Sequence, residues 1–405
     1  MQNLNPPSFF AGAQLALDRP SRQSPAKLGL RRHGGGMQAA KITVGSVLFP
    51  ALALGLAALF MLGEGWISRI PASIDFVPPT VAAVLLIGAV FAGLQHAEIL
   101  GAKTGEPFGT LILTIAVTII EVAIMVSMIE HGHEDPTEAR EAVFSAIMIV
   151  CNGLVGLCLL FGGFRHHEQE IQPMATSAYL AILIALSVLT LILPDYTTSS
   201  YGPTLSTSQL IFVSILSVLL YSSFLFIQTV RHRSYFIDVH VAAEGHGAMK
   251  PSRGIAILAV MGLGASLLGV SLLAEQVVPG LEEALRWLGV DDVNRVTGAA
   301  VAMLVLLPES MNSIRAATRN ALQTSLNGAL GSVVATIGLT VPSVAIMSLV
   351  TDREIMFGLD KRDTMLLLLT LLLSVVSFGA GRTNLLTGLV HLVVFATYIF
   401  LLFVP

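Results

Sequence analysis

The sequence predicts an all-α polytopic membrane protein with about eleven transmembrane helices. The 405 residues are 54% hydrophobic and 12% charged, whereas a soluble protein carries about 25% charged residues. Eleven apolar runs follow one another, each near the roughly 20 residues that a helix needs to cross a bilayer. A hydrophilic break at 231–253 leaves five runs on each side once the first is set apart. A five-span repeat must re-enter the membrane in the opposite orientation, so we expect one extra N-terminal helix and two inverted five-helix repeats.

The eleven runs define the expected elements in order. They are 42–63, 79–100, 108–129, 141–161, 174–193, 208–230, 254–278, 295–314, 322–350, 364–380 and 384–404. The run 322–350 is too long for one straight span, and we expect it to include an entry segment.

The hydrophilic segments set the expected domain boundaries. Residues 1–40 contain four prolines and the run RRHGGG and predict a disordered cytoplasmic tail, with Met37 as a possible translation start. Residues 41–78 form the extra first helix and its outer loop. The first repeat then covers 79–230, a cytoplasmic linker 231–253, and the second repeat 254–405.

The distribution of positive charge predicts the orientation. With the N-terminus inside, 15 of the 22 Lys and Arg residues fall on the cytoplasmic side, as the positive-inside rule requires. We therefore expect the C-terminus outside.

Two lone glutamates indicate the functional site. Glu121 lies near the middle of an otherwise uncharged run, and Glu309 is the one ionisable residue in 296–314. A carboxylate at that depth is costly and usually faces a polar cavity, where it has a function. Proline at 308 frees a backbone carbonyl next to Glu309. One such acid in each half predicts a cation site, although a protonated, hydrogen-bonded glutamate would also fit the pattern.

Nearby polar residues are candidate ligands. Thr118 precedes Glu121 by one helical turn, and Asn152, Ser332 and Thr336 lie in the small-residue segments that follow the two acids. Their oxygen atoms suit a hard cation, but helix packing explains such residues equally well. The pattern Asn-Gly-x-x-Gly begins at both Asn152 and Asn327, which suggests that these segments are equivalent in the two repeats.

Three further residues could form an inner mouth. His96 and Glu98 end the second run, and Glu275 lies near the end of the seventh. Solvation at the membrane interface is the alternative interpretation.

Other classes of protein lack support in the sequence. It contains no Walker A motif, no His-Glu-x-x-His motif and no Gly-x-Ser-x-Gly motif, so we expect neither an ATP-driven pump nor an enzyme. Nothing points to nucleic acid or to a bound cofactor. The two cysteines, Cys151 and Cys158, share an apolar run and are expected to be packing residues.

Several segments resemble bacterial calcium/proton antiporters of the cation/calcium exchanger superfamily. The resemblance covers about 41–405 and is carried by HAE at 96–98, GEPFGT at 105–110, LPE at 307–309 and GSVVATIGLTVP at 331–342. It implies that Glu121 and Glu309 bind Ca²⁺, or sodium in some branches, and exchange it for protons. It also implies a multi-pass protein of the bacterial cytoplasmic membrane, with Ca²⁺, H⁺ and the lipid bilayer as partners.

The expected mechanism is alternating access. Burial favours the neutral form of each carboxyl group, so protons occupy the empty pair and a cation displaces them. The alternatives are Na⁺/H⁺ or K⁺/H⁺ antiport on the same fold, a cation channel, and a membrane enzyme acting near His96 and Glu98.

Overall fold

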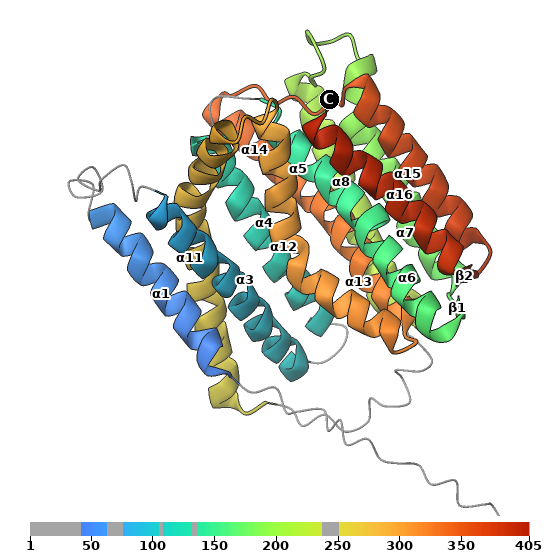
Figure 1. Ribbon diagram of the computed structural model, residues 1–405, viewed down its shortest axis with the longest axis horizontal. Coiled ribbons are helices and arrows are strands. Elements are labelled where there is room, and N and C mark those ends of the chain that lie inside the picture. Colours follow the sequence, from blue (N-terminus) through green and yellow to red (C-terminus); the bar gives the residue numbers. More distant parts are fainter. Residues whose placement is uncertain (1–41, 63–75, 105–107, 132–135, 237–250, 405) are drawn as a thin grey trace, which may run out of the picture. The chain divides into compact units, whose positions relative to one another are not determined.

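The structure is a computed structural model that describes residues 42–62, 76–104, 108–131, 136–236 and 251–404. The expected N-terminal tail, Met37 and most of the expected linker lie outside the described residues. Helices occupy nearly all of the described chain (Figure 1). The first part contains α1 (Val44–Leu62), α3 (Val77–Thr104), α4 (Phe108–His131), α5 (Glu138–Met148), η2 (Ile149–Leu154), α6 (Val155–His166), α7 (Pro173–Ser187), η3 (Val188–Ile192), η4 (Leu193–Tyr196), α8 (Thr207–Phe226), η5 (Ile227–Arg231) and α9 (Arg233–Phe236).

The second part continues from residue 251. It contains α11 (Arg253–Trp287), α12 (Val293–Thr318), α13 (Leu322–Ala335), η6 (Thr336–Thr340), α14 (Val341–Thr351), α15 (Lys361–Gly379) and α16 (Leu385–Phe403). Strands β1 (Glu168–Glu170) and β2 (Arg382–Asn384) pair antiparallel, with Gln169 opposite Thr383.

Each predicted apolar run coincides with a helix. Among the described residues, ten helical segments are long and apolar enough to cross a membrane. The third run coincides with α4. The apolar stretch of α4 that the structure describes, Ile115–Met125, is shorter than the ten membrane-spanning segments. In the run 322–350, α13, η6 and α14 follow one another without a break, and the expected entry segment stays a prediction. The wider π-helical turn of η6 lies inside this span, as π-turns do at many functional sites.

The helices pack around two hydrophobic clusters. The smaller cluster joins α1, α3 and α11 to one side of α4 and α12. The larger one fills the space among α5–α8 and α12–α16. Figure 1 shows α1, α3 and α11 side by side, next to α4 and α12. Helices α4 and α12, which carry the two lone glutamates, therefore lie between the two packing units.

A proline explains how α1 is attached. Pro50 lies inside α1 and has no N–H, so the carbonyl of Ser46 loses its helical donor. The His96 ring of α3 takes that place, with Nε2 2.9 Å from the Ser46 oxygen. Gly262 of α11 makes room for the ring, since a Cβ there would overlap His96. One histidine thus joins three helices.

The two ends of the bundle are closed differently. The short β1–β2 ribbon joins the end of α6 to the link between α15 and α16. At the opposite end, 352–360 crosses several helix ends as an extended segment. Its backbone binds Pro136, Pro203 and Leu191 through the N–H groups of Met356, Gly358 and Leu359, and Phe357 is buried beneath it.

Candidate cation site

Glu121 of α4 and Glu309 of α12 come together in the middle of the bundle. The Glu121 side chain is 6% exposed, and the charges of the two carboxyl groups are close enough to interact. Oε2 of Glu309 is buried and has no hydrogen-bond partner among the described residues. Two acids that lie 188 positions apart therefore share one site, with an acceptor oxygen available for a ligand.

Thr336 supplies the first hydroxyl of this site. Its Oγ1 lies 2.9 and 2.8 Å from the two oxygen atoms of Glu121. A threonine in a regular helix commonly donates to the carbonyl one turn earlier. Thr336 begins the π-helical turn η6 and binds Glu121 instead, so the second half of the chain positions the acid of the first half.

Two more of the predicted hydroxyls lie beside the pair. Ser332 is one turn before Thr336 and contacts the Glu309 carboxyl, although its Oγ makes no hydrogen bond of normal geometry to a described residue. Thr118 is buried one turn before Glu121 on α4. Carboxylate and hydroxyl oxygens are ligands for hard cations. No cluster of three His, Cys, Asp or Glu side chains occurs in the described ranges, so the cation ligands here would be this mixed set.

Tyr221 is a neighbour that sequence reasoning missed. Its charge interactions reach both Glu121 and Glu309, and its ring packs against Gly338, where a Cβ would come within 2.9 Å of the Tyr221 Cβ. A tyrosine within an apolar run carries no signal of its own. Close approach of α8 to η6 is needed to bring it to the site.

Asn152 does not join the glutamate pair in this structure. Its amide donates to Thr370 at 2.8 Å, and its oxygen lies 3.3 Å from Nδ1 of His391. The ligand role of Asn152 stays a prediction. Asn327 lies near the start of α13, whereas Asn152 lies in η2, after α5. These different positions within their helices make the suggested equivalence of the two residues wrong. Gly153 of η2 packs against Phe395 as Gly338 of η6 packs against Tyr221.

The three inner-mouth candidates lie apart. His96 is buried against α1 and α11, whereas Glu98 is exposed and interacts with Asn312. Helices α3 and α11 run antiparallel, because Lys103 near the end of α3 donates to Pro251 at the start of α11. Glu275 is therefore displaced from Glu98 toward the opposite end of the bundle. Inverted repeats place corresponding residues at opposite ends, so grouping these two acids in one mouth is wrong.

A small cavity, with room for about one water molecule, lies beside Glu121. Apart from Glu121 and Thr336, its walls are apolar: Met125, Ala142, Ala146, Val301, Ala302, Val305 and Leu306. Along each helix, these residues are displaced from Glu121 toward the end of the bundle at which α5 and α12 begin. At Gly298 the two helices nearly touch, since a Cβ would lie 3.0 Å from the backbone of Ala142.

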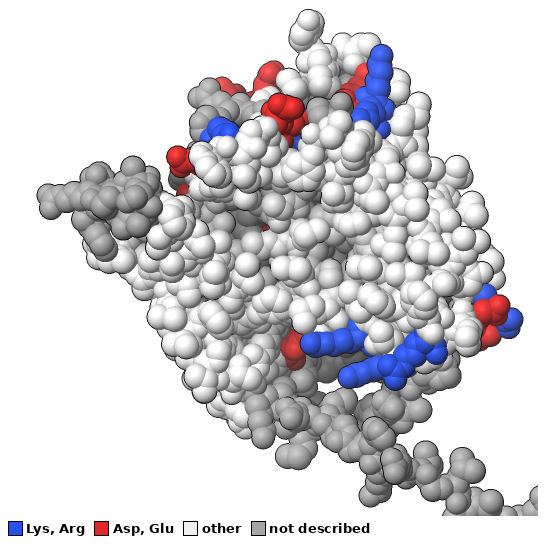
Figure 2. Space-filling model, in the orientation of Figure 1, with Lys and Arg blue, Asp and Glu red and all other residues white. Residues whose placement is uncertain are grey.

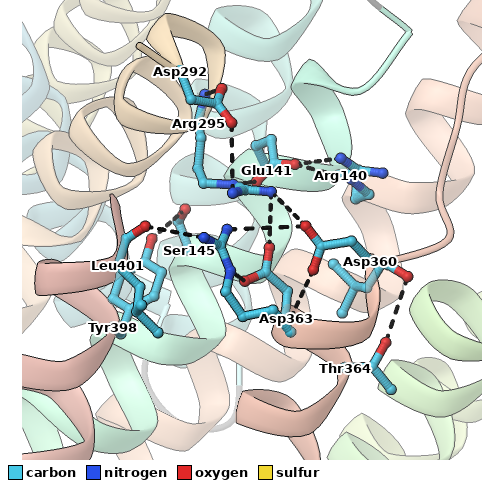
Figure 3. A network of polar contacts seen from close by, with 12 residues as sticks. Arg140, Glu141, Ser145, Asp292, Arg295, Asp360, Asp363, Thr364, Tyr398 and Leu401 are labelled. Carbon is cyan, nitrogen blue, oxygen red and sulfur yellow. Dashed lines mark hydrogen bonds and ion pairs between the residues drawn. The ribbon is translucent and has the colours of Figure 1, made fainter. Parts of the chain in front are cut away.

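Beyond Gly298 lies a network of charges (Figure 3). Arg295 of α12 binds Glu141 of α5 at 3.3 Å, and Asp360 and Asp363 at the start of α15 at 2.8 and 3.2 Å. Arg140 also pairs with Glu141 and donates to the carbonyl of Gly358 at 2.8 Å. The network connects the first turns of three helices with the segment 352–360.

Comparisons with known proteins identify a matching family and similar transporters. The family model described as "Sodium/calcium exchanger protein" matches residues 80–230 and 258–404. The protein y4hA of Sinorhizobium fredii (strain NBRC 101917 / NGR234), provisionally named an ionic transporter, is 44% identical over 80% of this chain and 88% of its own. The sodium-potassium/proton antiporter ChaA of Escherichia coli (strain K12) is 33% identical over 88% of this chain and 96% of its own.

Solved structures share the fold. The Ca²⁺/H⁺ antiporter protein YfkE has a TM-score of 0.64 at 16% identity, covering 89% of this chain and 99% of its own. The H⁺/Ca²⁺ exchanger CAX has a TM-score of 0.63 at 14% identity, covering 88% and 89%.

Proposed function

This chain belongs to the sodium/calcium exchanger protein family, and from that premise we propose that it exchanges Ca²⁺ for protons at Glu121 and Glu309. Members of this family are secondary transporters rather than enzymes, and the chain is a multi-pass membrane protein. The observation that carries the proposal is the pairing of two buried carboxyl groups from the two halves of the chain beside the Thr336 hydroxyl.

The charge of the pair suits the proposed exchange. Two ionised carboxylates balance one divalent cation, and two protons balance the same pair when the cation has left. Away from water an unneutralised carboxylate is strongly disfavoured. The site is therefore more stable with a cation or with protons bound than when it is empty and charged. Competition between the cation and the protons for the same two carboxyl groups couples the two fluxes.

The packing supports alternating access. The α1–α3–α11 unit has its own hydrophobic cluster and contacts α4 and α12, which carry the site. We propose that displacement of this unit relative to the larger cluster opens the site to one side and then the other.

Orientation is part of the proposal. Figure 2 shows basic side chains along one edge of the molecule and mixed charges along the opposite edge. Basic residues at the end that carries the β1–β2 ribbon include Lys103, Arg165, Arg231, Arg253, Arg315, Arg319 and Arg382. By the positive-inside rule this end faces the cytoplasm, with the N-terminus inside and the membrane the bacterial cytoplasmic membrane.

The second candidate is Na⁺/H⁺ or K⁺/H⁺ antiport. The similarity to ChaA, which is named a sodium-potassium/proton antiporter, favours it. A monovalent cation would use the same oxygens and leave one carboxyl group protonated.

The test uses purified protein in proteoliposomes with an imposed proton gradient. Internal pH is followed while Ca²⁺, Na⁺ or K⁺ is added outside. Collapse of the gradient by Ca²⁺ in the wild-type protein and in Glu283→Gln, but not in Glu121→Gln, supports the proposal. Glu283 is a suitable control because it is exposed on α11. Collapse by Na⁺ or K⁺ alone would replace Ca²⁺ with the monovalent ion.

A further inference from the structure

Helix α12 carries an exposed apolar ridge on its outer side. Met303, Leu307 and Met311 follow one another at intervals of four residues and are between 37% and 43% exposed. Side chains at this spacing form one continuous ridge along a helix, and we call these three residues the α12 ridge. Glu309 lies two residues from both Leu307 and Met311, so its side chain leaves the opposite side of α12. The ridge and the candidate cation site are therefore separated by the thickness of one helix.

The α12 ridge emerges at the boundary between the two packing units. On one flank of the ridge, Leu304 packs against the smaller hydrophobic cluster, which includes α1, α3 and α11. On the other flank, Ala299 and Leu306 belong to the larger cluster. Helix α12 contacts both α3 and α6 and lies between them in Figure 1. The ridge is therefore exposed where the two units meet, rather than on the outside of one of them.

Three arginines follow the ridge at the end of the bundle that carries the β1–β2 ribbon. Arg315 and Arg319 continue the spacing of four residues along α12. Arg165 of α6 is next to His166, whose Nε2 lies 3.1 Å from the carbonyl oxygen of Thr318. All three arginines are exposed. Figure 2 shows basic side chains gathered at the lower edge of the face on which α12 lies. The ridge thus runs from an apolar stretch into a basic end.

These arginines differ from those at the opposite end of the bundle. There Arg140 and Arg295 both pair with the buried Glu141. At the basic end of the ridge, the charge of Glu98 reaches Arg315, but none of the three arginines forms an ion pair with a described residue. A guanidinium group binds phosphate oxygens through two parallel hydrogen bonds. An unpaired cluster of this kind at a membrane interface suits an anionic headgroup.

We propose that an anionic phospholipid binds at the α12 ridge, with an acyl chain along the ridge and its phosphate at Arg315, Arg319 and Arg165. The apolar ridge favours a lipid over a free phosphate, because it continues from the arginines toward the middle of the membrane. Basic residues between transmembrane helices on the cytoplasmic side are typical of sites for anionic headgroups. The charge of the headgroup and the length of the ridge together define the ligand.

The position of the lipid gives it an effect on exchange. It contacts α12 on the side opposite Glu309, at the boundary between the two units that we propose to move during alternating access. A ligand shifts a conformational equilibrium when it binds one state better than the other, and displacement of the units changes the surface that the acyl chain contacts. The rate of exchange should therefore depend on anionic lipid. This consequence rests on the proposed function, whereas binding of the lipid does not.

The first test measures lipid selectivity at the ridge. The two native tryptophans are replaced by phenylalanine (Trp66→Phe with Trp287→Phe), and Leu307→Trp then reports quenching by lipids with brominated acyl chains. Brominated phosphatidylglycerol should be preferred about fivefold or more over brominated phosphatidylcholine, which has a phosphate but no net charge. The control is Ile215→Trp on α8, whose native side chain is exposed and where the two lipids should quench alike.

The arginines are then removed in the same background. Arg315→Gln with Arg319→Gln should abolish the preference at the ridge. Arg382→Gln should keep it, because Arg382 is an exposed arginine at the same end that pairs with Glu170. All variants are compared with the wild type by their unfolding temperature.

A further single variant keeps the test decisive if the double variant does not fold. Arg165→Gln lies on another helix and should lower the preference by itself. Equal quenching by the two lipids at the ridge when all arginines are present would overturn the proposal. A preference that survives the loss of these arginines would also overturn it.

The second test measures the effect on exchange in proteoliposomes. Replacing part of the phosphatidylcholine by phosphatidylglycerol should raise the rate of proton-coupled cation exchange about fivefold more in the wild type than in Arg315→Gln with Arg319→Gln. Both proteins experience the same membrane surface charge, so an equal response would assign the effect to that charge and overturn the link to exchange. If the wild type exchanges no cation in either lipid, the proposed function fails, while the quenching experiment still decides whether the lipid binds.

Discussion

Thr336 contacts both carboxylate oxygens of Glu121, at 2.9 and 2.8 Å, across the two halves of the chain. The contact is possible because the π-turn η6 directs this hydroxyl away from its own helix. It fixes the orientation of the acid before a cation arrives. The site is therefore partly preorganised, with Glu121 held in place and Oε2 of Glu309 available.

Replacing Thr336 by Val should weaken cation binding without preventing folding. A hydrogen bond to a charged group contributes about 1.5–3 kcal/mol, so the half-saturating cation concentration should rise roughly 10-fold to 100-fold. Thr336→Ser keeps the hydroxyl and should stay close to the wild type. Both are measured as initial rates of gradient collapse against cation concentration. Equal affinities in Thr336→Val and wild type would show that the contact with Glu121 does not contribute to binding.

Protons should compete with the cation on the same side of the membrane. Because cation binding requires ionised carboxylates, apparent affinity should rise as pH rises. Displacement of two protons changes the half-saturating concentration by up to about 100-fold per pH unit, and displacement of one by about tenfold. Initial rates measured over a series of external pH values give this slope. A slope of zero would mean that cation and proton use separate sites.

The charge network should stabilise the end of the bundle that carries 352–360. Arg295 is 9% exposed and binds acids of two other helices. Removing one partner of a buried ion pair costs about 3–5 kcal/mol, so Arg295→Gln should lower the unfolding temperature in detergent by several degrees. Arg382→Gln breaks an exposed pair with Glu170 and serves as the control. If both variants melt alike, the network does not hold α5, α12 and α15 together.

A methyl group at Gly262 should loosen α1. The His96 ring occupies the space in which that methyl group would lie, so Gly262→Ala should displace the ring from the Ser46 carbonyl. We expect faster proteolysis of α1 and a lower unfolding temperature. Gly264→Ala, two residues along the same helix, adds a methyl group where no atom lies within 4 Å and should behave like the wild type. Equal stability of the two variants would contradict this role for His96.

The sequence predicted the helices and the central acids well, for physical reasons. An apolar run long enough to cross a bilayer indicates a membrane protein. A carboxylate within such a run is costly unless it lies at a polar site. Glu121 and Glu309 therefore stand out without any structure. Thr336 was found because its hydroxyl lies in the segment that follows the second acid.

The sequence could not predict contacts that depend on how helices face one another. The contacts of Tyr221, Arg295 and Asn152 depend on which helices approach one another closely. That close approach occurs at small residues such as Gly153, Gly298 and Gly338. The separation of Glu98 from Glu275 depends on the direction of each span. His96 is near the end of its helix in sequence, but its contact with Ser46 depends on a carbonyl that Pro50 frees in another helix.

The most direct test of the central claim is cation-driven collapse of a proton gradient in proteoliposomes containing Glu121→Gln or Glu309→Gln. Glutamine keeps the size of the side chain and removes its titratable charge. We predict that each variant folds, as judged by its unfolding temperature, and that neither moves protons in response to Ca²⁺, Na⁺ or K⁺. Cation-dependent proton flux at the wild-type rate in either variant would contradict exchange through the shared glutamate pair.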